Sequence, residues 1–463
     1  MSPRNASPAI RASLRGHDPS DEQWAAIEHP PIPLAIIAGA GAGKTAIMAA
    51  RIVWMVEQEI CRPSQILGLT FTNKAALELE ERIVSAFAAM DPEPHEHPTV
   101  STYNSFADRL VREHGVRIGI DPEVGLLSQA QSWQLLLGQF DDLPPFEAIE
   151  SRSMASIVRN ALSLADACAN HLVDPLDIVK QDERLVEDPS KFEDDVIKAS
   201  RQRMELSRVV QAYTSAKGRA GRIDFGDQVT QAVKILDTFP EVVRELRERY
   251  PALLLDEYQD TNVAQRRLLQ ALAPHGHNVT AVGDARQNIF QWRGSTLFNL
   301  LDFPRKHFLR ADGEQHDYLS LSENFRSGSN ILDVANRIIE PVPEQRRPGQ
   351  PLRAVADNGQ GVVKARLLSD QYTEGAFIAG EISRLHGASA AANRPVTSWS
   401  DFAILVRRKA HIAPIYLQLK QLDIPVEVVG LSGLLQVPEV VDTVSWLRVL
   451  ADPGPNGNRW LAR

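Results

Sequence analysis

The sequence has little of what secreted and membrane proteins depend on. Only two of its 463 residues are cysteines, and Cys61 and Cys168 have no cysteine or histidine neighbours at metal-ligand spacing. A disulfide framework and a zinc site are therefore not expected, and a reducing compartment fits the chain. No stretch approaches the roughly 20 apolar residues that a bilayer span needs. These absences predict a cytoplasmic protein without a membrane partner.

Basic residues are also in the minority, since 59 Asp and Glu against 50 Lys and Arg give a net charge of −9. Net charge bears on solubility and association, and a local basic cleft can still bind nucleic acid. Residues 1–18 contain no apolar segment of the signal-peptide type, so we expect a short flexible tail and no export. With 43% hydrophobic and 24% charged residues, the chain has the composition of a globular protein of about three domains.

Short apolar runs alternate with helical patterns in two separate regions. In the first region, strands are predicted at 34–38, 66–70, 99–101, 252–255 and 279–282, with helices that end at 57, run from 73 to about 90 and begin at 103. In the second region, strands are predicted at 318–321, 361–368, 402–406 and 426–429, and helices at 329–339, 374–385, 412–421 and 438–450. Strands that alternate with helices predict parallel, doubly wound sheets.

The first region is interrupted between about 111 and 223. This stretch lacks strand-like alternation, and its apolar spacing predicts helices at 129–140, 154–169 and 192–216. Lys44 and Asp256, on either side of the interruption, lie too far apart in sequence for one small nucleotide-binding sheet. We therefore predict a helical domain inserted into the first α/β domain.

The first predicted strand enters a glycine-rich turn with the spacing of a phosphate-binding loop. Small residues let backbone N–H groups curl around phosphates, and the N-terminus of the following helix adds a favourable dipole. Lys44 would neutralise the β and γ phosphates, and Thr45 would place its hydroxyl on Mg²⁺. One position departs from the strict pattern, because Ala38 stands where glycine is usual. The predicted nucleotide-binding residues are Ala38, Gly39, Ala40, Gly41, Ala42, Gly43, Lys44 and Thr45.

A second apolar run, at 252–255, ends in the carboxylate pair Asp256 and Glu257. A carboxylate at a strand end can hold Mg²⁺ opposite Thr45, which makes Asp256 the second predicted metal ligand. Glu257 can orient or deprotonate the attacking water. By itself the pair could be a surface cap of the next turn, and the phosphate loop favours the metal and water site.

Seven stretches, in order along nearly the whole chain, resemble the motifs of the UvrD/Rep-type helicases of superfamily 1. Two positions depart from the family pattern: Asn104 stands where histidine is usual, and Phe325 stands where tyrosine is frequent. The stretches are SDEQ at 20–23, AGAGAGKT at 38–45, LTFTNKAA at 69–76 with Glu78 and Arg82, TYNSF at 102–106, LLLDEYQDTN at 253–262, VGDARQNIFQWRG at 282–294 and LSENFRS at 321–327.

The resemblance implies four further contacts to the nucleotide. Gln23 is the glutamine of the adenine-reading motif, and Phe325 stacks on the adenine ring. Gln287 senses the γ phosphate and reports to Trp292. Arg326 reaches across from the second motor domain as an arginine finger, a device that can be worth about 10³–10⁵ in rate.

The resemblance also implies the residues that grip single-stranded DNA. Phe71 and Trp292 stack on bases, and each stack is worth about 1–3 kcal/mol without sequence preference, as a translocating motor needs. Lys74 and Arg293 contact phosphates. The same gripping motif includes Thr72 and Asn73.

The implied fold is α/β: a RecA-like phosphate-loop NTPase domain with a parallel doubly wound sheet and a helical insertion, followed by an incomplete second RecA-like domain. The expected limits are 1–18 for the flexible tail, 19–110 and 224–316 for the first motor domain, 111–223 for its insertion, 317–432 for the partial second motor domain and 433–463 for the start of a second inserted domain.

The implied activity is that of an ATP-dependent 3′–5′ DNA helicase or translocase, serving DNA repair or recombination at the nucleoid. The implied cofactors are ATP and Mg²⁺. The implied partners are single-stranded DNA, junctions of single strand and duplex, and repair or recombination proteins. The family's last two motifs do not occur in the 463 residues. We therefore expect this N-terminal portion to bind ATP, to bind DNA weakly and to unwind little or no duplex.

Two alternatives stay open at this point. The chain could be the motor part of a helicase–nuclease, in which a nuclease domain follows, or an ATP- and DNA-binding module that does not translocate. A nucleotide kinase or GTPase is a more distant alternative, because it would explain the phosphate loop but not the motifs around Phe71, Trp292 and Arg326.

Overall fold

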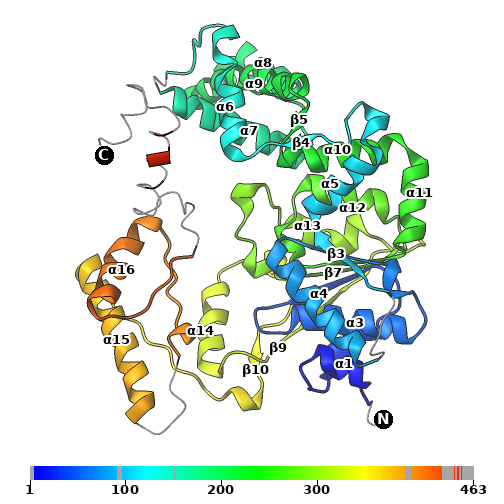
Figure 1. Cartoon of the computed structure of the whole chain (residues 1–463), viewed down its shortest axis with the longest axis vertical. Coiled ribbons are helices and arrows are strands. Elements are labelled where there is room, and N and C mark those ends of the chain that lie inside the picture. Colours follow the sequence, from blue (N-terminus) through cyan, green and yellow to red (C-terminus); the bar gives the residue numbers. More distant parts are fainter. Residues whose placement is uncertain are drawn as a thin grey trace. The chain divides into compact units, whose positions relative to one another are not determined.

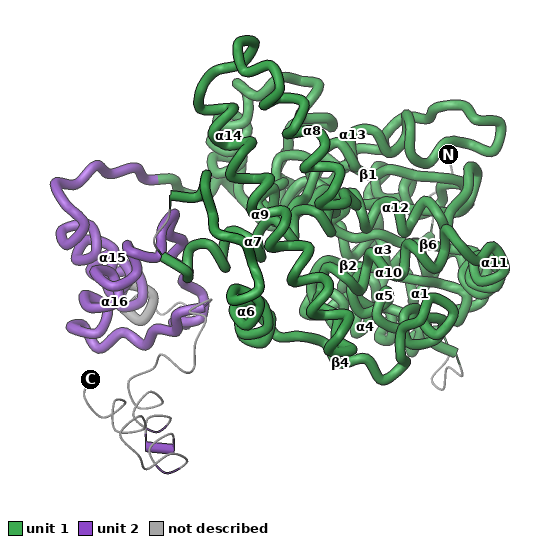
Figure 2. The backbone as a smooth tube through the Cα atoms, turned by 90° about the horizontal axis from the view of Figure 1, so that it is seen from above, with its two compact units in different colours: residues 1–363 green, residues 364–463 purple. Residues whose placement is uncertain are grey.

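The computed structural model describes residues 5–90, 96–150, 153–391 and 398–429, and the four single positions 443, 446, 447 and 450. Contacts divide the chain into two compact units, 1–363 and 364–463 (Figure 2). No helix among the described residues is long and apolar enough to cross a bilayer. All seven sequence motifs fall within the first unit.

The first unit is built on a six-stranded sheet with the strand order β3-β2-β6-β7-β1-β8, in which every neighbouring pair is parallel. The doubly wound parallel sheet expected from the sequence is confirmed, and its predicted strands lie within one residue of the observed ones. The strands are β1 (Leu34–Ala38), β2 (Ile66–Thr70), β3 (Thr99–Thr102), β6 (Ala252–Leu255), β7 (Asn278–Gly283) and β8 (Tyr318–Leu321).

Helices cover both faces of this sheet (Figure 1). Every residue of β1, β2 and β6 is buried, which explains why these strands read as continuous apolar runs. Along β1, Ala35 and Ile37 face one core, and Ile36 and Ala38 face the other. The first core includes α5 (Tyr103–His114), α10 (Phe225–Thr238), α11 (Pro240–Arg249) and α12 (Val263–Leu272); the second includes α1 (Pro8–Ser13), α2 (Asp21–Ile27), α3 (Lys44–Glu57) and α4 (Asn73–Ala88).

The short helix α1 corrects the expectation that residues 1–18 form a flexible tail. Ser7 caps this helix by accepting a hydrogen bond from the backbone N–H of Ile10, at 3.1 Å. Ala9, Ile10 and Leu14 are buried in the core that α3 and α4 share. A helix of six residues is too short to show a helical period in the sequence, so its apolar positions gave no signal there.

The edge strand β8 corrects the expectation that 318–321 begins a second sheet. It pairs with β1, with Ala35 opposite Tyr318 and Ala38 opposite Leu321. The carboxyl ends of parallel strands meet at one edge of a sheet. The residues that follow β8 therefore leave the sheet beside the turn that follows β1.

The expected helical insertion is present, and Figure 1 shows it as a separate layer of helices beyond α10. A two-residue parallel pair, β4 (Gly125–Leu126) with β5 (Arg222–Ile223), closes its base. Its small core includes Leu136, Val158 and Tyr213. One helix, α8, was not predicted from the sequence. The helices are α6 (Gln129–Leu137), α7 (Met154–His171), α8 (Pro175–Glu187) and α9 (Asp194–Arg219).

The first unit ends with elements that follow β7 and β8. A single turn, α13 (Phe298–Leu301), follows β7. After β8 come a two-stranded parallel pair, β9 (Glu323–Asn324) with β10 (Arg353–Ala354), and the helix α14 (Ser329–Ile339) between them. The predicted limits of α14 agree with the observed ones.

The second unit contains α15 (Gln371–Ala391) and α16 (Ile412–Gln421), which pack through a small cluster that includes Ala379 and Leu419. Residues 361–368, 402–406 and 426–429, predicted as strands, form no ladder with any described residue. Leu367 and Leu405 are accordingly 99% and 96% exposed. The alternating pattern alone was not sufficient to predict a strand, because a strand also needs a neighbouring strand for its backbone hydrogen bonds. The helix predicted at 438–450 lies outside the continuously described residues.

Candidate functional site

The candidate phosphate loop is the turn between β1 and α3. Gly41 and Gly43 have φ values of +80° and +86°, a backbone region that favours glycine. Gly43 is the N-cap of α3, so Lys44 and Thr45 form its first turn. The unpaired N–H groups and the positive dipole of a helix start are thus combined with a lysine and a hydroxyl. An anion such as a nucleotide phosphate fits this combination.

Gln23, which the resemblance assigns to the adenine-reading motif, lies beside this loop. A methyl group added at Gly43 would lie 3.5 Å from Gln23 Nε2. The Oε1 atom of Gln23 accepts from the backbone N–H of Ser20 at 3.1 Å, which fixes the buried side chain at the start of α2. The fully buried Arg51 holds the other end of α2, since its Nη1 donates to the carbonyls of Ala26 and Ile27, each at 3.1 Å.

The carboxylate pair lies at the carboxyl end of β6. Asp256 is only 2% exposed, and its Oδ1 accepts from the backbone N–H of Glu257 at 2.9 Å. Lys44 Nζ lies 3.5 Å from Glu257 Oε2. Burial, with a smaller contribution from the Glu257 charge, raises the pKa of Asp256 to about 7. A buried carboxyl whose ionisation is opposed in this way is stabilised by a nearby cation.

The oxygen groups here fit a divalent cation of the Mg²⁺ type. Mg²⁺ prefers oxygen ligands and is usually bound by one or two carboxylates together with substrate phosphates and water. Asp256 supplies one carboxylate and Thr45 one hydroxyl. Within the described ranges, no cluster of three or more His, Cys, Asp or Glu side chains offers a complete protein cage for a metal. The donor set therefore fits an ion that arrives with a nucleotide.

A chain of hydrogen bonds runs from Glu257 to Gln287. Gln259 Nε2 donates to Glu257 Oε2 at 2.8 Å, and Gln259 Oε1 accepts from the backbone N–H of Asp284 at 2.9 Å. Gln287 Nε2 then donates to Asp284 Oδ2 at 2.7 Å. A second branch leaves Gln259, because Asn288 Nδ2 donates to the Gln259 carbonyl and to Ser295 Oγ. Sequence reasoning had picked out Glu257 and Gln287, but not the two residues between them.

The segment after β8 lies against the phosphate loop. Asn324 Nδ2 donates to the carbonyl of Ala40, and the backbone N–H of Phe325 donates to the carbonyl of Gly41 at 2.9 Å. Asn324 Oδ1 accepts from the backbone N–H of Arg326 at 2.9 Å. Arg326 therefore reaches the loop from the edge of the same sheet, and not across from a second domain as expected. The side chains of Phe325 and Arg326 are both exposed.

The aromatic residues expected to grip DNA are brought together from two loops. The ring centroids of Phe71, after β2, and Phe290, after β7, are 5.0 Å apart, and those of Phe290 and Trp292 are 6.3 Å apart. The Arg293 guanidinium lies 4.7 Å from the centroid of the Trp292 ring, which is 74% exposed. Phe290 was not predicted as a site residue, although an aromatic residue two positions before Trp292 was the available signal. We call residues 288–295 the aromatic loop.

The remaining residues of the predicted gripping motif lie at the start of α4. Thr72 caps the helix, since its Oγ1 accepts from the backbone N–H of Ala75 at 3.1 Å. Asn73 and Lys74 are exposed in its first turn. Lys74 Nζ lies 3.8 Å from Glu78 Oε1, but both side chains are more than half exposed, so this pair is weak and leaves the cation accessible to a phosphate.

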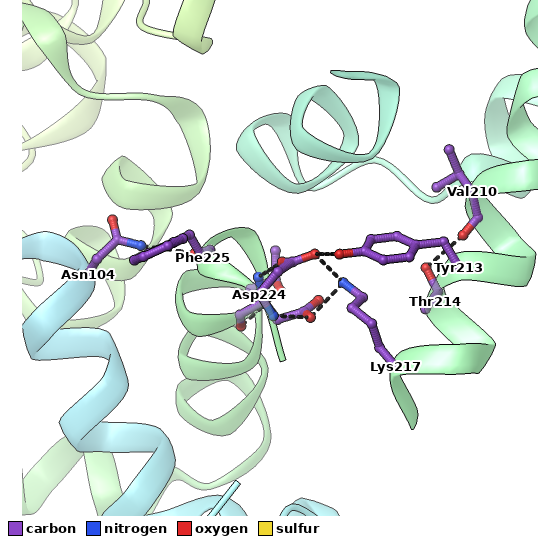
Figure 3. A network of polar contacts seen from close by, with 9 residues as sticks. Asn104, Val210, Tyr213, Thr214, Lys217, Asp224 and Phe225 are labelled. Carbon is purple, nitrogen blue, oxygen red and sulfur yellow. Dashed lines mark hydrogen bonds and ion pairs between the residues drawn. The ribbon is translucent and has the colours of Figure 1, made fainter. Parts of the chain in front are cut away.

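Asn104, which replaces the usual histidine, is tied to the start of α10. Its Nδ2 donates to the carbonyl of Phe225 at 2.9 Å and to Gln228 Oε1 at 3.1 Å. Figure 3 shows this contact beside a buried ion cluster in which Lys217 of α9 lies 2.6 Å from the carboxylates of both Asp224 and Asp227. The cluster joins the helical insertion to α10.

The sequence of this chain matches a known protein family. A family model described as the UvrD/REP helicase N-terminal domain matches residues 20–308, which is more than half of the chain. The chain belongs to the UvrD/REP helicase family. A second model, the UvrD-like helicase C-terminal domain, matches residues 319–456 of this UvrD/REP member.

Individual relatives agree with this assignment. The chain is 32% identical to the ATP-dependent DNA helicase UvrD1 of Mycobacterium leprae over 457 residues, which are 95% of the chain and 53% of the relative. It is 28% identical to the ATP-dependent DNA helicase PcrA of Bacillus subtilis over 424 residues, 91% of the chain and 51% of the relative. This UvrD/REP member thus spans about half the length of the relatives it matches.

Proposed function

We propose that the chain is the ATP-binding motor portion of a 3′–5′ DNA helicase or translocase, in which single-stranded DNA stimulates ATP hydrolysis. One observation carries this proposal: hydrogen bonds run from Glu257 to Gln259, and from there on one branch through Asp284 to Gln287 and on another to Asn288 of the aromatic loop. These bonds connect Glu257, which can orient water at a phosphate, with the loop that carries Trp292, the most exposed aromatic side chain of the motifs. A nucleotide kinase or GTPase would have no use for such a connection.

At the nucleotide, Lys44 neutralises the β and γ phosphates, and the N–H groups of residues 39–45 surround them. Glu257 orients the attacking water and accepts its proton, while Gln287 senses the γ phosphate. Thr45 and Asp256 would hold Mg²⁺, which would supply charge neutralisation at the phosphates. The adenine is read by Gln23 and stacked by Phe325, and Arg326 stabilises the charge that develops on the γ phosphate.

At the DNA, Phe71 and Trp292 stack on bases, and the structure adds Phe290 to the same row of rings. Lys74 and Arg293 contact phosphates, with Thr72 and Asn73 in the same motif. The substrates are single-stranded DNA and its junctions with duplex. Repair or recombination proteins at the nucleoid are the proposed partners.

The proposed domain limits follow the motifs for the first motor domain, 19–110 and 224–316, for its insertion, 111–223, and for the second inserted domain, 433–463. Because β8 pairs with β1, residues 317–321 are assigned to the first motor domain, and the partial second motor domain is proposed to begin after β8 and to end at 432. The segments 364–368, 402–406 and 426–429, which form no ladder with any described residue, favour a further proposal about the isolated chain. It binds ATP and single-stranded DNA, but it acts as a binding module that unwinds little duplex.

The test uses the 463-residue chain with Lys44→Ala, Trp292→Ala and, as a control at another exposed aromatic residue, Phe192→Ala. Fluorescent ATP analogue binding, oligo(dT) anisotropy and ATP hydrolysis with and without oligo(dT) are measured at low salt. Lys44→Ala should lose nucleotide affinity and hydrolysis, and Trp292→Ala should lose oligo(dT) affinity by about 5-fold to 150-fold. A parent chain that binds nucleotide but neither binds nor responds to oligo(dT) would contradict the proposal.

A further inference from the structure

The side chain of Asn170, near the end of α7, joins the helical insertion to the aromatic loop. Its Nδ2 donates to the backbone carbonyl of Arg293 at 3.2 Å. Its Oδ1 accepts from Asn262 Nδ2 at 2.7 Å. Both ends of one amide are therefore used, and each binds a different segment of the motor domain.

The two segments held by Asn170 belong to the two functional parts of the motor. Asn262 ends the LLLDEYQDTN motif and caps α12, since its Oδ1 accepts from the backbone N–H of Gln265 at 2.8 Å. It also forms an isolated antiparallel bridge with Ser295, the last residue of the aromatic loop. Asn170 thus lies where the carboxylate motif and the aromatic loop meet.

Close packing restricts this contact further. Gly294 has a φ of +80°, and a methyl group added there would lie 2.8 Å from the Cβ of Asn170. The glycine therefore allows the aromatic loop to approach α7, and any side chain at this position would push the loop away. The contact depends on a small residue on one side and an amide on the other.

Asn170 is not needed to end its own helix. The backbone N–H of Leu172, in the left-handed conformation, bonds to the last carbonyls of α7, and the N–H of Val173 bonds to the carbonyl of Cys168 at 2.9 Å. These backbone bonds close the helix in the usual way. The side chain of Asn170 is left to bind the motor domain.

We propose that Asn170 is a positioning residue, which holds the backbone of Arg293 and thereby sets the position of the DNA-contacting side chains of the aromatic loop. This inference rests on the proposed DNA binding by Trp292 and Arg293. It makes the helical insertion part of the link between nucleotide and DNA, because a movement of α7 relative to the sheet would pull on this loop.

The first experiment is amide hydrogen exchange on the parent chain, Asn170→Ala, Asn170→Asp and the control Asn160→Ala, an exposed position on the same helix. The N–H groups of Arg293, Gly294 and Ser295 are bonded within the aromatic loop and report on its order. Exchange over 288–296 should be about 2-fold to 10-fold faster in both Asn170 variants, the factor expected for one lost hydrogen bond. Asn170→Asp keeps the acceptor for Asn262 and loses only the donor to Arg293.

The second experiment measures oligo(dT) affinity in a double-mutant cycle. Asn170→Ala should weaken binding about 2-fold to 10-fold in the parent and by a clearly smaller factor in the Trp292→Ala background, because part of its effect acts through Trp292. A general loss of structure would instead weaken both backgrounds and also nucleotide binding. Equal weakening in both backgrounds overturns the proposal.

The two experiments separate failure of this inference from failure of the proposed function. If the parent chain does not bind oligo(dT), the proposed DNA binding fails, and the exchange experiment still decides whether Asn170 orders the loop. If exchange over 288–296 is the same in Asn170→Ala, Asn160→Ala and the parent, Asn170 is not a positioning residue.

Discussion

The buried ion cluster between α9 and α10 gives the most direct test of what fixes the helical insertion to the motor domain. The side chain of Lys217 is 7% exposed, and those of Asp224 and Asp227 are 16% and 19% exposed. Lys217→Met would keep a long, unbranched side chain and remove its positive charge. Two carboxylates would then remain buried without a counter-charge, and Tyr213, which donates to Asp224 at 3.1 Å, offers only a neutral partner.

Removing one partner of a buried ion pair costs about 3–5 kcal/mol, so Lys217→Met should lose this much stability. At about 2.1 cal/mol/K per residue, a cooperative unit of 363 residues has an unfolding entropy near 0.76 kcal/mol/K. The melting temperature should therefore fall by about 4–7 °C. The matched control is Lys180→Met, because the pair of Lys180 with Asp177 is about two-thirds exposed and solvent screening leaves it little effect on stability.

The loss should also depend on pH. Without Lys217, burial and mutual repulsion raise the folded-state pKa of the aspartate pair above its value in the unfolded chain, so the folded variant binds a proton more tightly. The stability that the variant loses relative to the parent should therefore be smaller at pH 5 than at pH 8. In the parent, burial opposes ionisation of Asp224, but the Lys217 charge and hydrogen bonds outweigh it and lower the pKa of Asp224, while burial and the Asp224 charge raise the pKa of Asp227.

Melting is followed by far-UV circular dichroism at pH 5 and pH 8, without nucleotide. Adding Asp227→Asn to Lys217→Met should recover part of the loss, because one of the two uncompensated charges is removed while an oxygen that can accept from the Asp224 N–H is kept. A fall in melting temperature no larger than that of Lys180→Met, or a loss equal at both pH values, would refute the assignment of a stabilising buried cation.

Three further predictions concern the phosphate loop, the end of α2 and the aromatic loop. Gly41→Ala should weaken fluorescent ATP analogue binding at least 10-fold without unfolding the chain, because a methyl group there would lie 2.5 Å from Asn324 Nδ2; unchanged affinity would show that the loop is not held from that side. Arg51→Met should cost about 2–4 kcal/mol in urea unfolding, since it leaves buried carbonyls of α2 unpaired; a cost below 1 kcal/mol would contradict this. Phe290→Ala should lower oligo(dT) affinity by about 1–3 kcal/mol in anisotropy titrations, and it should leave ATP analogue binding unchanged if the ring serves DNA alone.

Local patterns were sufficient to predict three buried strands of the sheet and one amphipathic helix. The strands β1, β2 and β6 and the helix α14 were predicted with their observed limits, because continuous apolar runs and a strong helical period are properties of neighbouring residues. The strands predicted at 361–368 and 402–406 show where such reasoning fails. Their alternation is visible in the sequence, but no described residue supplies the neighbouring strand that would pair with them.

The sequence by itself determined the chemistry of the phosphate loop. The order of small residues, Lys44 and Thr45 between a strand and a helix requires only local backbone geometry, and so does the pair Asp256 and Glu257 at a strand end. The family assignment follows from such motifs in order. Their spacing along the chain is independent of how the sheet is arranged.

Only the tertiary structure decided which distant residues act together. Gln259 and Asp284 link Glu257 to Gln287, and Asn170 ties the insertion to the aromatic loop, through side chains that no motif spacing relates. The attachment of Asn324 and Phe325 to the phosphate loop, which brings Arg326 beside it, likewise follows from β8 pairing with β1. Hydrogen bonds of about 3 Å between residues far apart in sequence exist only after the strands have been ordered.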